Sequence, residues 1–324
     1  MTLRALGNSN VKVSPLCLGG NVFGWSVDEK TSFSILDGLV AAGFNFIDTA
    51  DVYVRWAPGH QGGESETIIG NWLKKSGNRS KVIIATKVGM EMGPNDKGLS
   101  KNYIFQAVER SLERLQTDYI DLYQSHQDDP TTPIEETLEA YAELIKQGKV
   151  RVIGASNFTA ERLAAALEVS ERHGYPRYEC LQPHYNLCER ARYEPTLEPL
   201  CLERKLGVIP YFSLASGFLT GKYRSEADLS KSPRGQGVKK YLNERGMGIL
   251  AALDQVSQKL QSTPGKVSLA WLLARPSITA PIASASNLSQ LDDLIDSTNL
   301  TLDRESIELL THASAWSAQA GSTA

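Results

Sequence analysis

Short apolar segments alternate with longer amphipathic segments along nearly the whole chain, and this alternation restricts the fold more than any other feature. Each apolar segment has the length of a buried strand, and the sequence that follows it has helical periodicity. The eight strand candidates cover residues 16–18, 44–48, 82–86, 119–123, 150–155, 180–182, 208–211 and 279–282. Because strands that alternate with helices form parallel βαβ units, the sequence predicts an α/β protein with a parallel sheet.

Eight such units can close into a (β/α)8 TIM barrel, whose active site lies at the carboxyl ends of the strands. An open doubly wound sheet is the competing fold, because it shows the same alternation with fewer strands. The helix candidates cover residues 29–42, 64–75, 102–115, 134–147, 160–173, 195–205, 248–261, 267–274 and 290–296. Residues 3–6 and 11–13 predict a short N-terminal β-hairpin, and residues 1–324 are expected to form a single domain.

The composition and charge of the chain are typical of a globular protein. Apolar residues make up 41% of the sequence, charged residues 22%, and the net charge is -3. This balance indicates neither a nucleic-acid partner nor attraction to a membrane surface. The chain shows no secretion signal and no uninterrupted apolar run of about 18 residues, so we expect a cytoplasmic protein without a membrane span. A monomer is the default expectation.

The cysteines give no sign of a metal site. Their positions are Cys17, Cys180, Cys188 and Cys201. No two of them form a CxxC pair, and their spacing fits no zinc site. We therefore expect buried free thiols and no bound metal.

Four polar side chains follow three successive strand candidates. Asp48 ends one strand and Tyr53 lies in the loop after it, whereas Lys87 and His126 follow the next two strands. A lysine ammonium favours a phenolate and should lower the tyrosine pKa from about 10, while a carboxylate would hold the lysine. With a histidine orienting a carbonyl oxygen, the group could deliver a proton to an alkoxide as it forms. The hydride for such a reduction must come from a nicotinamide cofactor.

Each of these residues also has a structural interpretation. Asp48 can cap a turn, and Tyr53 can be an exposed loop aromatic. Lys87 can reach solvent, and His126 can be a buried structural histidine. A barrel hydrolase or lyase that uses Asp48 and His126 without a cofactor is a further alternative. The joint placement of all four at strand ends favours the reductase interpretation.

Several segments resemble, in order, the motifs of the aldo-keto reductases. The segments are GFNFIDTADVY, GESETIIGNWLK, VIIATKVG, DYIDLYQSHQDD, GKVRVIGASNF, YFSLASGFLTGKY and PIASASNLSQLDDLI. They span about residues 3–300, and the bacterial members and the potassium-channel β-subunits look nearest. The resemblance implies that Tyr53 is the general acid, that Lys87 paired with Asp48 lowers its pKa, and that His126 orients the carbonyl.

The same resemblance implies a cofactor site. Ser156, Asn157 and Gln182 would hold the nicotinamide carboxamide, and Tyr211 would stack on the nicotinamide ring. The full set of expected cofactor contacts is Gly20, Asn21, Asp48, Ser156, Asn157, Gln182, Tyr211, Phe212, Ser213, Leu214, Ser216, Gly217, Leu219, Lys222, Arg234, Ser284, Ser286, Gln290 and Asp293. The expected substrate pocket comprises Trp25, Tyr53, Trp56 and His126.

The cofactor is expected to be NADP(H), with NAD(H) as the alternative. The chain has no GxGxxG fingerprint that opens a helix, which agrees with a barrel that binds the dinucleotide in extended form. Asn287 stands where many relatives carry an arginine near the adenosine 2′-phosphate, and this removes a bidentate clamp. Ser213 replaces a proline of many relatives and could add a hydroxyl to the phosphate site. Lys222, Ser286 and Arg234 still favour NADP(H).

Two polar segments are expected to border the site. Residues 224–246 are too long for an idle loop and predict a lid or a binding loop. Residues 54–63 follow the tyrosine, with Arg55 or His60 near the pocket. The tail 314–324 is expected to be disordered or to flank the site. Trp25 and Trp56 either line the pocket, which would favour a flat or ring-bearing substrate, or pack only against each other. A redox-sensing regulatory subunit with slow turnover is the second functional hypothesis.

Overall fold

The computed structural model describes residues 2–316 and shows a (β/α)8 barrel. Eight parallel strands follow each other in the order β10-β3-β4-β5-β6-β7-β8-β9. Backbone bonds close the ring, since the amide of Thr279 donates to Val208 (2.8 Å) and that of Ile282 to Pro210 (2.9 Å). The strands are β3 (Cys17–Gly19), β4 (Phe46–Asp48), β5 (Ile83–Val88), β6 (Ile120–Ser125), β7 (Val150–Ser156), β8 (Tyr178–Gln182), β9 (Gly207–Val208) and β10 (Ile282–Ala283).

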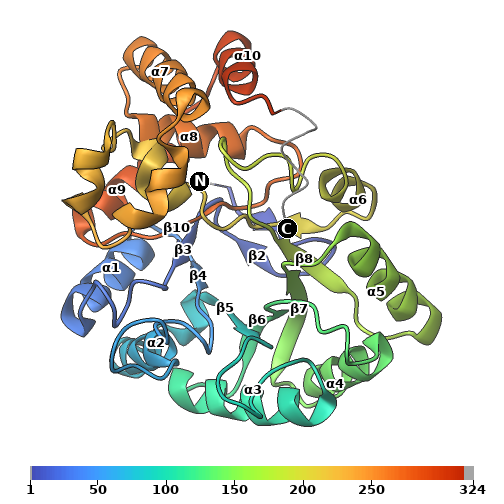
Figure 1. The fold of residues 1–324 in the computed structure, drawn as a ribbon. Coiled ribbons are helices and arrows are strands. Elements are labelled where there is room, and N and C mark those ends of the chain that lie inside the picture. The colour runs from blue at the N-terminus through green and yellow to red at the C-terminus, as the bar shows by residue number, and fades with distance from the viewer. Residues whose placement is uncertain (1, 317–324) are drawn as a thin grey trace.

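Helices surround the strands on the outside of the barrel (Figure 1). They are α1 (Glu29–Ala41), α2 (Glu64–Ser76), α3 (Lys101–Leu115), α4 (Ile134–Lys146), α5 (Ala160–His173), α6 (Leu197–Glu203), α7 (Glu244–Lys259), α8 (Pro264–Leu273), α9 (Leu288–Ser297) and α10 (Arg304–Ala313). Side-chain caps begin many of them: Ser100 accepts from the third amide of α3, and Thr159 does the same for α5. Gly174, in the left-handed region at φ 67°, ends α5.

Some element boundaries differ from the sequence expectation for a covalent reason. The strand predicted at 208–211 pairs as a strand only over β9, and the strand predicted at 279–282 pairs only over β10. Pro210 and Pro281 interrupt these segments and carry no amide N–H for the ladder. Helix α10 was not predicted, although Asp303 caps it by accepting from the amide of Ser306.

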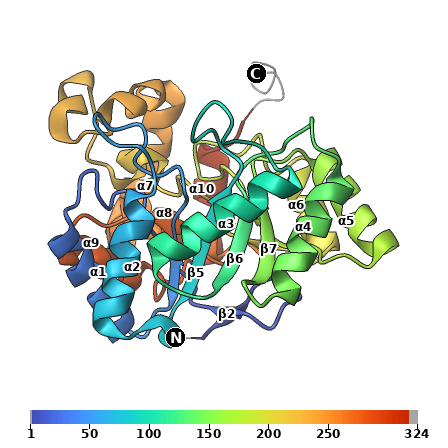
Figure 2. The same cartoon turned by 90° about the horizontal axis from the view of Figure 1, so that it is seen from below.

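The predicted hairpin is present and closes the amino-terminal end of the barrel. Strands β1 (Arg4–Ala5) and β2 (Lys12–Val13) pair antiparallel, and β2 lies at the bottom of Figure 2. Its apolar residues pack on the first inward-facing residues of the barrel strands. This cluster comprises Leu6, Val11, Val13, Cys17, Phe46, Ala85, Leu122, Val152, Cys180, Ile209, Ala280 and Ile282. All four cysteines are buried free thiols.

The strand period of two places polar side chains inside the barrel above this apolar layer. Asp48, Lys87, Gln124 and Gln182 each follow a member of that layer by two residues, so they point to the same side of their strands. Because parallel strands carry their carboxyl ends to one rim, these residues form a polar layer there.

The polar segment 224–246 lies at this carboxyl end, opposite β2, where it is coloured gold in Figure 2. It contains two 3-10 helices, η3 (Glu226–Lys231) and η4 (Gly235–Tyr241), and follows a third, η2 (Ala215–Thr220). A further 3-10 turn, η1 (Arg79–Lys81), precedes β5. Residues 317–324, most of the tail considered above, lie outside the described residues. Within residues 2–316, no helix combines the length and apolar character needed to cross a membrane.

The packing of the hairpin makes a testable prediction about stability. Leu6 is 0% exposed within the barrel cluster, whereas Leu3 in the same hairpin is 44% exposed. We expect Leu6→Ala to lower the free energy of unfolding by about 2–5 kcal/mol, because it leaves a cavity at the barrel floor. Leu3→Ala is the control and should change it by less than about 0.5 kcal/mol. Urea unfolding of both variants measures the free energy of unfolding. Equal effects of the two substitutions would contradict the packing of the hairpin against the floor of the barrel.

Candidate active site

A buried lysine organises the polar layer at the carboxyl end of the barrel. The Nζ atom of Lys87 donates to Asp48 Oδ2 (2.7 Å), to the carbonyl oxygen of Thr49 (2.7 Å) and to Tyr53 Oη (2.8 Å). An ammonium has three hydrogens, so every donor is used. Lys87 and Asp48 are both 0% exposed. The two charges therefore compensate each other inside the protein, as a buried ion pair requires.

Asp48 accepts hydrogen bonds on both carboxylate oxygens. Oδ2 accepts from Lys87 and from the hydroxyl of Tyr53 (3.0 Å), whereas Oδ1 accepts from Gln182 Nε2 (2.9 Å) and Gln124 Nε2 (3.5 Å). Gln124 was not among the residues selected from the sequence. The signal was present, because Gln124 lies two residues after Leu122 on the inward face of β6, where a buried glutamine needs polar partners.

The environment of Tyr53 corrects one expectation. Lys87 was expected to lower the pKa of Tyr53, but burial raises it well above 10, followed by the charge of Asp48 and the hydrogen bond to Asp48. The carboxylate accepts the phenolic proton and so stabilises the neutral form. Tyr53 therefore remains protonated at neutral pH, as a proton donor must.

His126 follows β6 and lies beside Tyr53, with the two ring centres 6.1 Å apart. Burial, and then the charge of Lys87, lower the pKa of His126 well below 6.5, so the imidazole is neutral. A neutral imidazole carries one N–H. Nδ1 is buried and has no hydrogen-bond partner among residues 2–316, so we assign the hydrogen to Nε2. His126 lines the cavity described next, where such an N–H can donate to a substrate oxygen.

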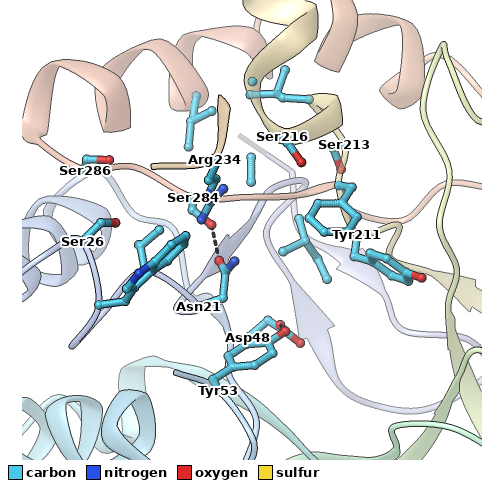
Figure 3. Close-up of a pocket in the computed structure, with 18 of the residues that line it drawn as sticks. Asn21, Ser26, Asp48, Tyr53, Tyr211, Ser213, Ser216, Arg234, Ser284 and Ser286 are labelled. Atoms are coloured by element: carbon cyan, nitrogen blue, oxygen red, sulfur yellow. Dashed lines mark hydrogen bonds between the residues drawn. The ribbon is translucent and has the colours of Figure 1, made fainter. Parts of the chain in front are cut away.

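Asp48, Tyr53, His126 and Gln182 border one large cavity of about 1130 Å³. Figure 3 shows Asp48 and Tyr53 on one side of it and Ser286 far from them. The cavity is lined by the predicted residues Asn21, Trp25, Asp48, Tyr53, Trp56, His126, Ser156, Asn157, Gln182, Tyr211, Phe212, Ser213, Leu214, Ser216, Gly217, Lys222, Arg234, Ser284, Ser286, Gln290 and Asp293. Gly20, Leu219 and Lys87 are not on its surface in the described part of the chain.

Gly20 and Leu219 have other roles in the structure. The amide of Gly20 donates to the carbonyl oxygen of Asp48 (2.7 Å), so it ties β3 to β4 beneath the cavity. Leu219 is 0% exposed and belongs to the hydrophobic core. Sequence analysis also missed several lining residues, including Val52, Met90, Gln127, Thr263, Gly265 and Lys266. They lie in loops or at a helix start, where no periodic pattern selects a side chain.

Hydrogen bonds connect the residues on one wall of the cavity. The hydroxyl of Tyr211 donates to Asn157 Oδ1 (2.7 Å), and Asn157 Nδ2 donates to the carbonyl oxygen of His126 (2.9 Å). Asn157 has a φ of 57°, which is uncommon for a residue with a side chain. Ser156 Oγ donates to the carbonyl oxygen of Gln182 (2.9 Å). The wall is thus held by the side chains of Ser156, Asn157 and Tyr211, two of which donate to the backbone carbonyl oxygens of Gln182 and His126.

Two cations lie along another part of the cavity. Lys222 follows η2, and Arg234 comes from the 224–246 segment and lies over the Trp25 ring at 5.7 Å. Burial lowers the pKa of Arg234, and its buried Nη2 has no partner among residues 2–316. Ser216 has a φ of 58°, a strained backbone conformation of the kind that ligand-binding loops often store. This wall offers positive charge and an unused donor.

Serine and asparagine side chains at the far end are used within the protein. Asn287 Oδ1 accepts from the amide of Gln290 (2.9 Å) and caps α9, while Gln290 Oε1 accepts from the amide of Ser286 (2.8 Å). Ser284 Oγ donates to Asn21 Oδ1 (2.6 Å), the dashed line in Figure 3. Ser213 was expected to offer its hydroxyl to the phosphates. Instead that hydroxyl donates to the carbonyl oxygen of Pro210 (3.0 Å).

Two tryptophans form the mouth of the cavity near Tyr53. Trp25 and Trp56 meet edge to face with ring centres 5.7 Å apart, and both line the cavity. The two tryptophans therefore pack against each other and line the cavity at the same time. Arg55 and His60 do not line the cavity in the described chain, and His60 instead approaches Glu64 (3.4 Å).

Two further buried acidic residues, Glu66 and Asp51, lie behind the site and were missed by the sequence analysis. Glu66 accepts from Thr86 Oγ1 (2.5 Å) and Arg114 Nε (2.7 Å). Asp51 is 1% exposed, and within the described chain its Oδ1 accepts only from the adjacent amide of Val52. Its Oδ2 has no hydrogen-bond partner among residues 2–316. Burial, and then the charge of Glu66, raise the pKa of Asp51 to about 8.

Comparisons with known proteins identify the family of the chain. The model of the Aldo/keto reductase family matches residues 15–315. The chain is 38% identical to the uncharacterized oxidoreductase YrpG of Bacillus subtilis, over 94% of this chain and 93% of that protein. It is 35% identical to the aldo-keto reductase YhdN of the same organism, over 92% and 87%. It is also 33% identical to a probable voltage-gated potassium channel subunit beta of Arabidopsis thaliana, over 90% of both.

The raised pKa of Asp51 predicts a pH dependence of stability. Between about pH 4 and pH 8 the folded protein keeps a proton on Asp51 that the unfolded chain releases, so this residue makes stability fall as pH rises. Asp51→Asn should remove that decrease and stabilise the protein at pH 8 by on the order of 2–5 kcal/mol. Urea unfolding at pH 5 and pH 8 measures the difference. Asp254→Asn, at an exposed ion pair, should keep the wild-type slope.

Proposed function

This chain belongs to the aldo/keto reductase family, and we propose that it interconverts an aldehyde or ketone and the corresponding alcohol with NADP(H). The observation that carries this proposal is the position of Tyr53. Its hydroxyl lies between Lys87 Nζ (2.8 Å) and Asp48 Oδ2 (3.0 Å), and Tyr53 and the neutral His126 both line the cavity. A protonated tyrosine beside a neutral histidine suits proton transfer to a carbonyl oxygen.

The cavity fits a dinucleotide in size and charge. A volume of about 1130 Å³ exceeds the roughly 300–1,000 Å³ that a single small ligand occupies. Lys222 and Arg234 supply positive charge on one wall, and the unpartnered Nη2 of Arg234 offers a donor for a phosphate. A bound nicotinamide cofactor would supply or accept the hydride of the reaction.

We assign the lining residues as follows. Ser156, Asn157 and Gln182 would hold the carboxamide, and Tyr211 would stack on the nicotinamide ring. Asn21, Asp48, Phe212, Ser213, Leu214, Ser216, Gly217, Lys222, Arg234, Ser284, Ser286, Gln290 and Asp293 complete the cofactor site. The tertiary structure supports this set because one continuous cavity reaches all of them.

The protein's part in the reaction is to hold and move one proton. Nε2–H of His126 donates to the carbonyl oxygen and places it near Tyr53 Oη. As negative charge develops on that oxygen, the Tyr53 hydroxyl leaves Asp48 and gives its proton to the oxygen. An alkoxide is a much stronger base than a phenolate, so the transfer is favourable even from a phenol of raised pKa. The Lys87 ammonium, already 2.8 Å away, then stabilises the phenolate.

The mouth of the cavity suggests the kind of substrate. Trp25, Val52, Trp56 and Met90 line the cavity near Tyr53, and none of them carries a charge. Aromatic walls favour flat or ring-bearing molecules. We propose that the substrate is an uncharged ring-bearing carbonyl compound. We also propose that the protein acts in the cytoplasm as a monomer, with the chain 1–324 as a single domain.

A regulatory subunit is the second candidate function. The observation in its favour is the 33% identity to a probable potassium channel β-subunit. Steady-state turnover on a panel of carbonyl compounds, together with pull-down from cell extract, separates the two functions. Turnover above about 1 per second with a suitable substrate supports the enzyme. Very slow turnover with tight NADPH binding and a captured partner supports the subunit.

The role of Tyr53 gives a direct test of the mechanism. We expect Tyr53→Phe to lower kcat at least about 100-fold, because general acid catalysis typically contributes 10²–10⁴-fold. NADPH binding, measured by quenching of tryptophan fluorescence, should remain near wild type. Tyr119→Phe removes a hydroxyl just before β6, at the opposite end of the barrel, and serves as the control. Near-normal turnover by Tyr53→Phe would contradict the proposed role of Tyr53 as the proton donor.

The cofactor preference can be tested with Lys222. We expect a higher kcat/KM with NADPH than with NADH, because Lys222 and Arg234 favour the additional phosphate. Lys222→Gln should reduce kcat/KM more for NADPH than for NADH, by about tenfold for a lost charge-assisted contact. Lys239→Gln, at an exposed ion pair with Glu226, is the control. An equal loss with both cofactors would place Lys222 at the shared pyrophosphate instead.

A further inference from the structure

A histidine that does not line the cavity packs against the back of one of its walls. The rings of His184 and Tyr211 are stacked, with centres 5.1 Å apart and planes inclined by 19°. Tyr211 lines the cavity within the described chain, whereas His184 does not. The imidazole therefore covers the side of the tyrosine ring that faces away from the cavity.

We propose that His184 is a positioning residue for the cofactor, because it fixes the ring of Tyr211 on which the nicotinamide would stack. This inference rests on the proposed function, which places a nicotinamide against Tyr211. His184 itself would touch neither the cofactor nor the substrate. Its contribution is to hold the tyrosine ring at the required angle before the cofactor binds. Less side-chain conformational entropy of Tyr211 is then lost on binding.

The backbone around the stacked pair is fixed at two points. His184 and Tyr211 form an isolated parallel β-bridge, in which the amide of Tyr211 donates to the carbonyl oxygen of Pro183 (2.9 Å). Asn186 Nδ2 donates to the carbonyl oxygen of Phe212 (2.9 Å). The segment after β8 is thus bonded to the segment after β9. These bonds hold side by side the two backbone segments that carry the stacked rings.

The imidazole is well suited to stacking because it is uncharged. Burial lowers the pKa of His184 to about 4, although Glu189 opposes this, and the charges of Lys240 and Arg192 lower it further. Its buried Nε2 has no hydrogen-bond partner among residues 2–316. An unpartnered buried nitrogen costs stability, so the polar atom is not what holds the ring in place. The flat ring is the part of His184 that the structure uses.

The support extends from Tyr211 to the substrate side. The Tyr211 hydroxyl donates to Asn157 Oδ1 (2.7 Å), and Asn157 Nδ2 donates to the carbonyl oxygen of His126 (2.9 Å). His126 is the residue proposed to orient the carbonyl. A tyrosine ring held by His184 therefore also holds the loop that carries His126.

The test measures cofactor affinity in variants of the full chain. NADPH dissociation constants are obtained from tryptophan fluorescence, and melting temperatures are measured without cofactor. We expect His184→Leu to raise the dissociation constant roughly two- to tenfold, the range expected for one aromatic pair. His184→Phe restores a flat ring and should bind within about twofold of wild type. The melting temperatures of the two variants should be similar, since both fill the site with an apolar group.

The chain contains a matched control for ring stacking. His173 stacks on Tyr175 with centres 5.5 Å apart and an inclination of 15°, at the carboxyl end of α5 and away from the cavity. His173→Leu should leave NADPH affinity unchanged. Tyr211→Phe, which keeps the ring and removes the bond to Asn157, should keep the affinity and lower kcat.

The outcomes separate this inference from the proposed function. If the wild-type protein does not bind NADP(H), the proposed function fails. If it binds and His184→Leu binds equally well, His184 has no positioning role. Equal weakening by His184→Leu and His184→Phe would also overturn the inference, because the flat ring would then not be the feature that matters.

Discussion

The buried ion pair between Lys87 and Asp48 is the interaction on which the site depends. Removing a charged side chain from water costs several kcal/mol, and the pair offsets this cost only because all its polar atoms have partners. Lys87 uses its three hydrogens, and Asp48 accepts on both oxygens. The barrel can satisfy these bonds only if β4, β5, β6 and β8 end at matching heights, so the ion pair and the barrel register support each other.

Because Lys87 and Asp48 compensate each other's charge, we assign the proton transfer to the neutral groups beside them. Tyr53 is held as a phenol between the ammonium and the carboxylate, and His126 is held as an imidazole. A protonated donor and a neutral hydrogen-bonding group are what an incoming carbonyl requires. The aromatic mouth and the cationic wall of the cavity meet where Arg234 lies over the Trp25 ring.

The sequence predicted the positions of these groups better than their properties. Asp48, Lys87 and His126 were placed together because parallel strands end at one rim, and the structure brings them there. The pKa of Tyr53 was predicted in the wrong direction, because charge alone was considered and burial was not. Gln124 was missed although its strand position was readable, and Asn287 proved to be a helix cap. Asp51 depends on what surrounds it, and no pattern in the sequence contains that information.

The sequence by itself determined the alternation of strands and helices and the residue types at the strand ends, because these follow from local periodicity and chain direction. Alternation left both a barrel and an open doubly wound sheet possible, and the closed ring of strands appears only in the tertiary structure. The tertiary structure decided which of those residues touch, which are buried and which ring packs behind another. His184 and Tyr211 are an example, since they are 27 positions apart and meet only because β8 and β9 are neighbours in the sheet. Burial, dielectric environment and long-range contact arise only when the chain closes on itself, so they cannot be read from neighbours in sequence.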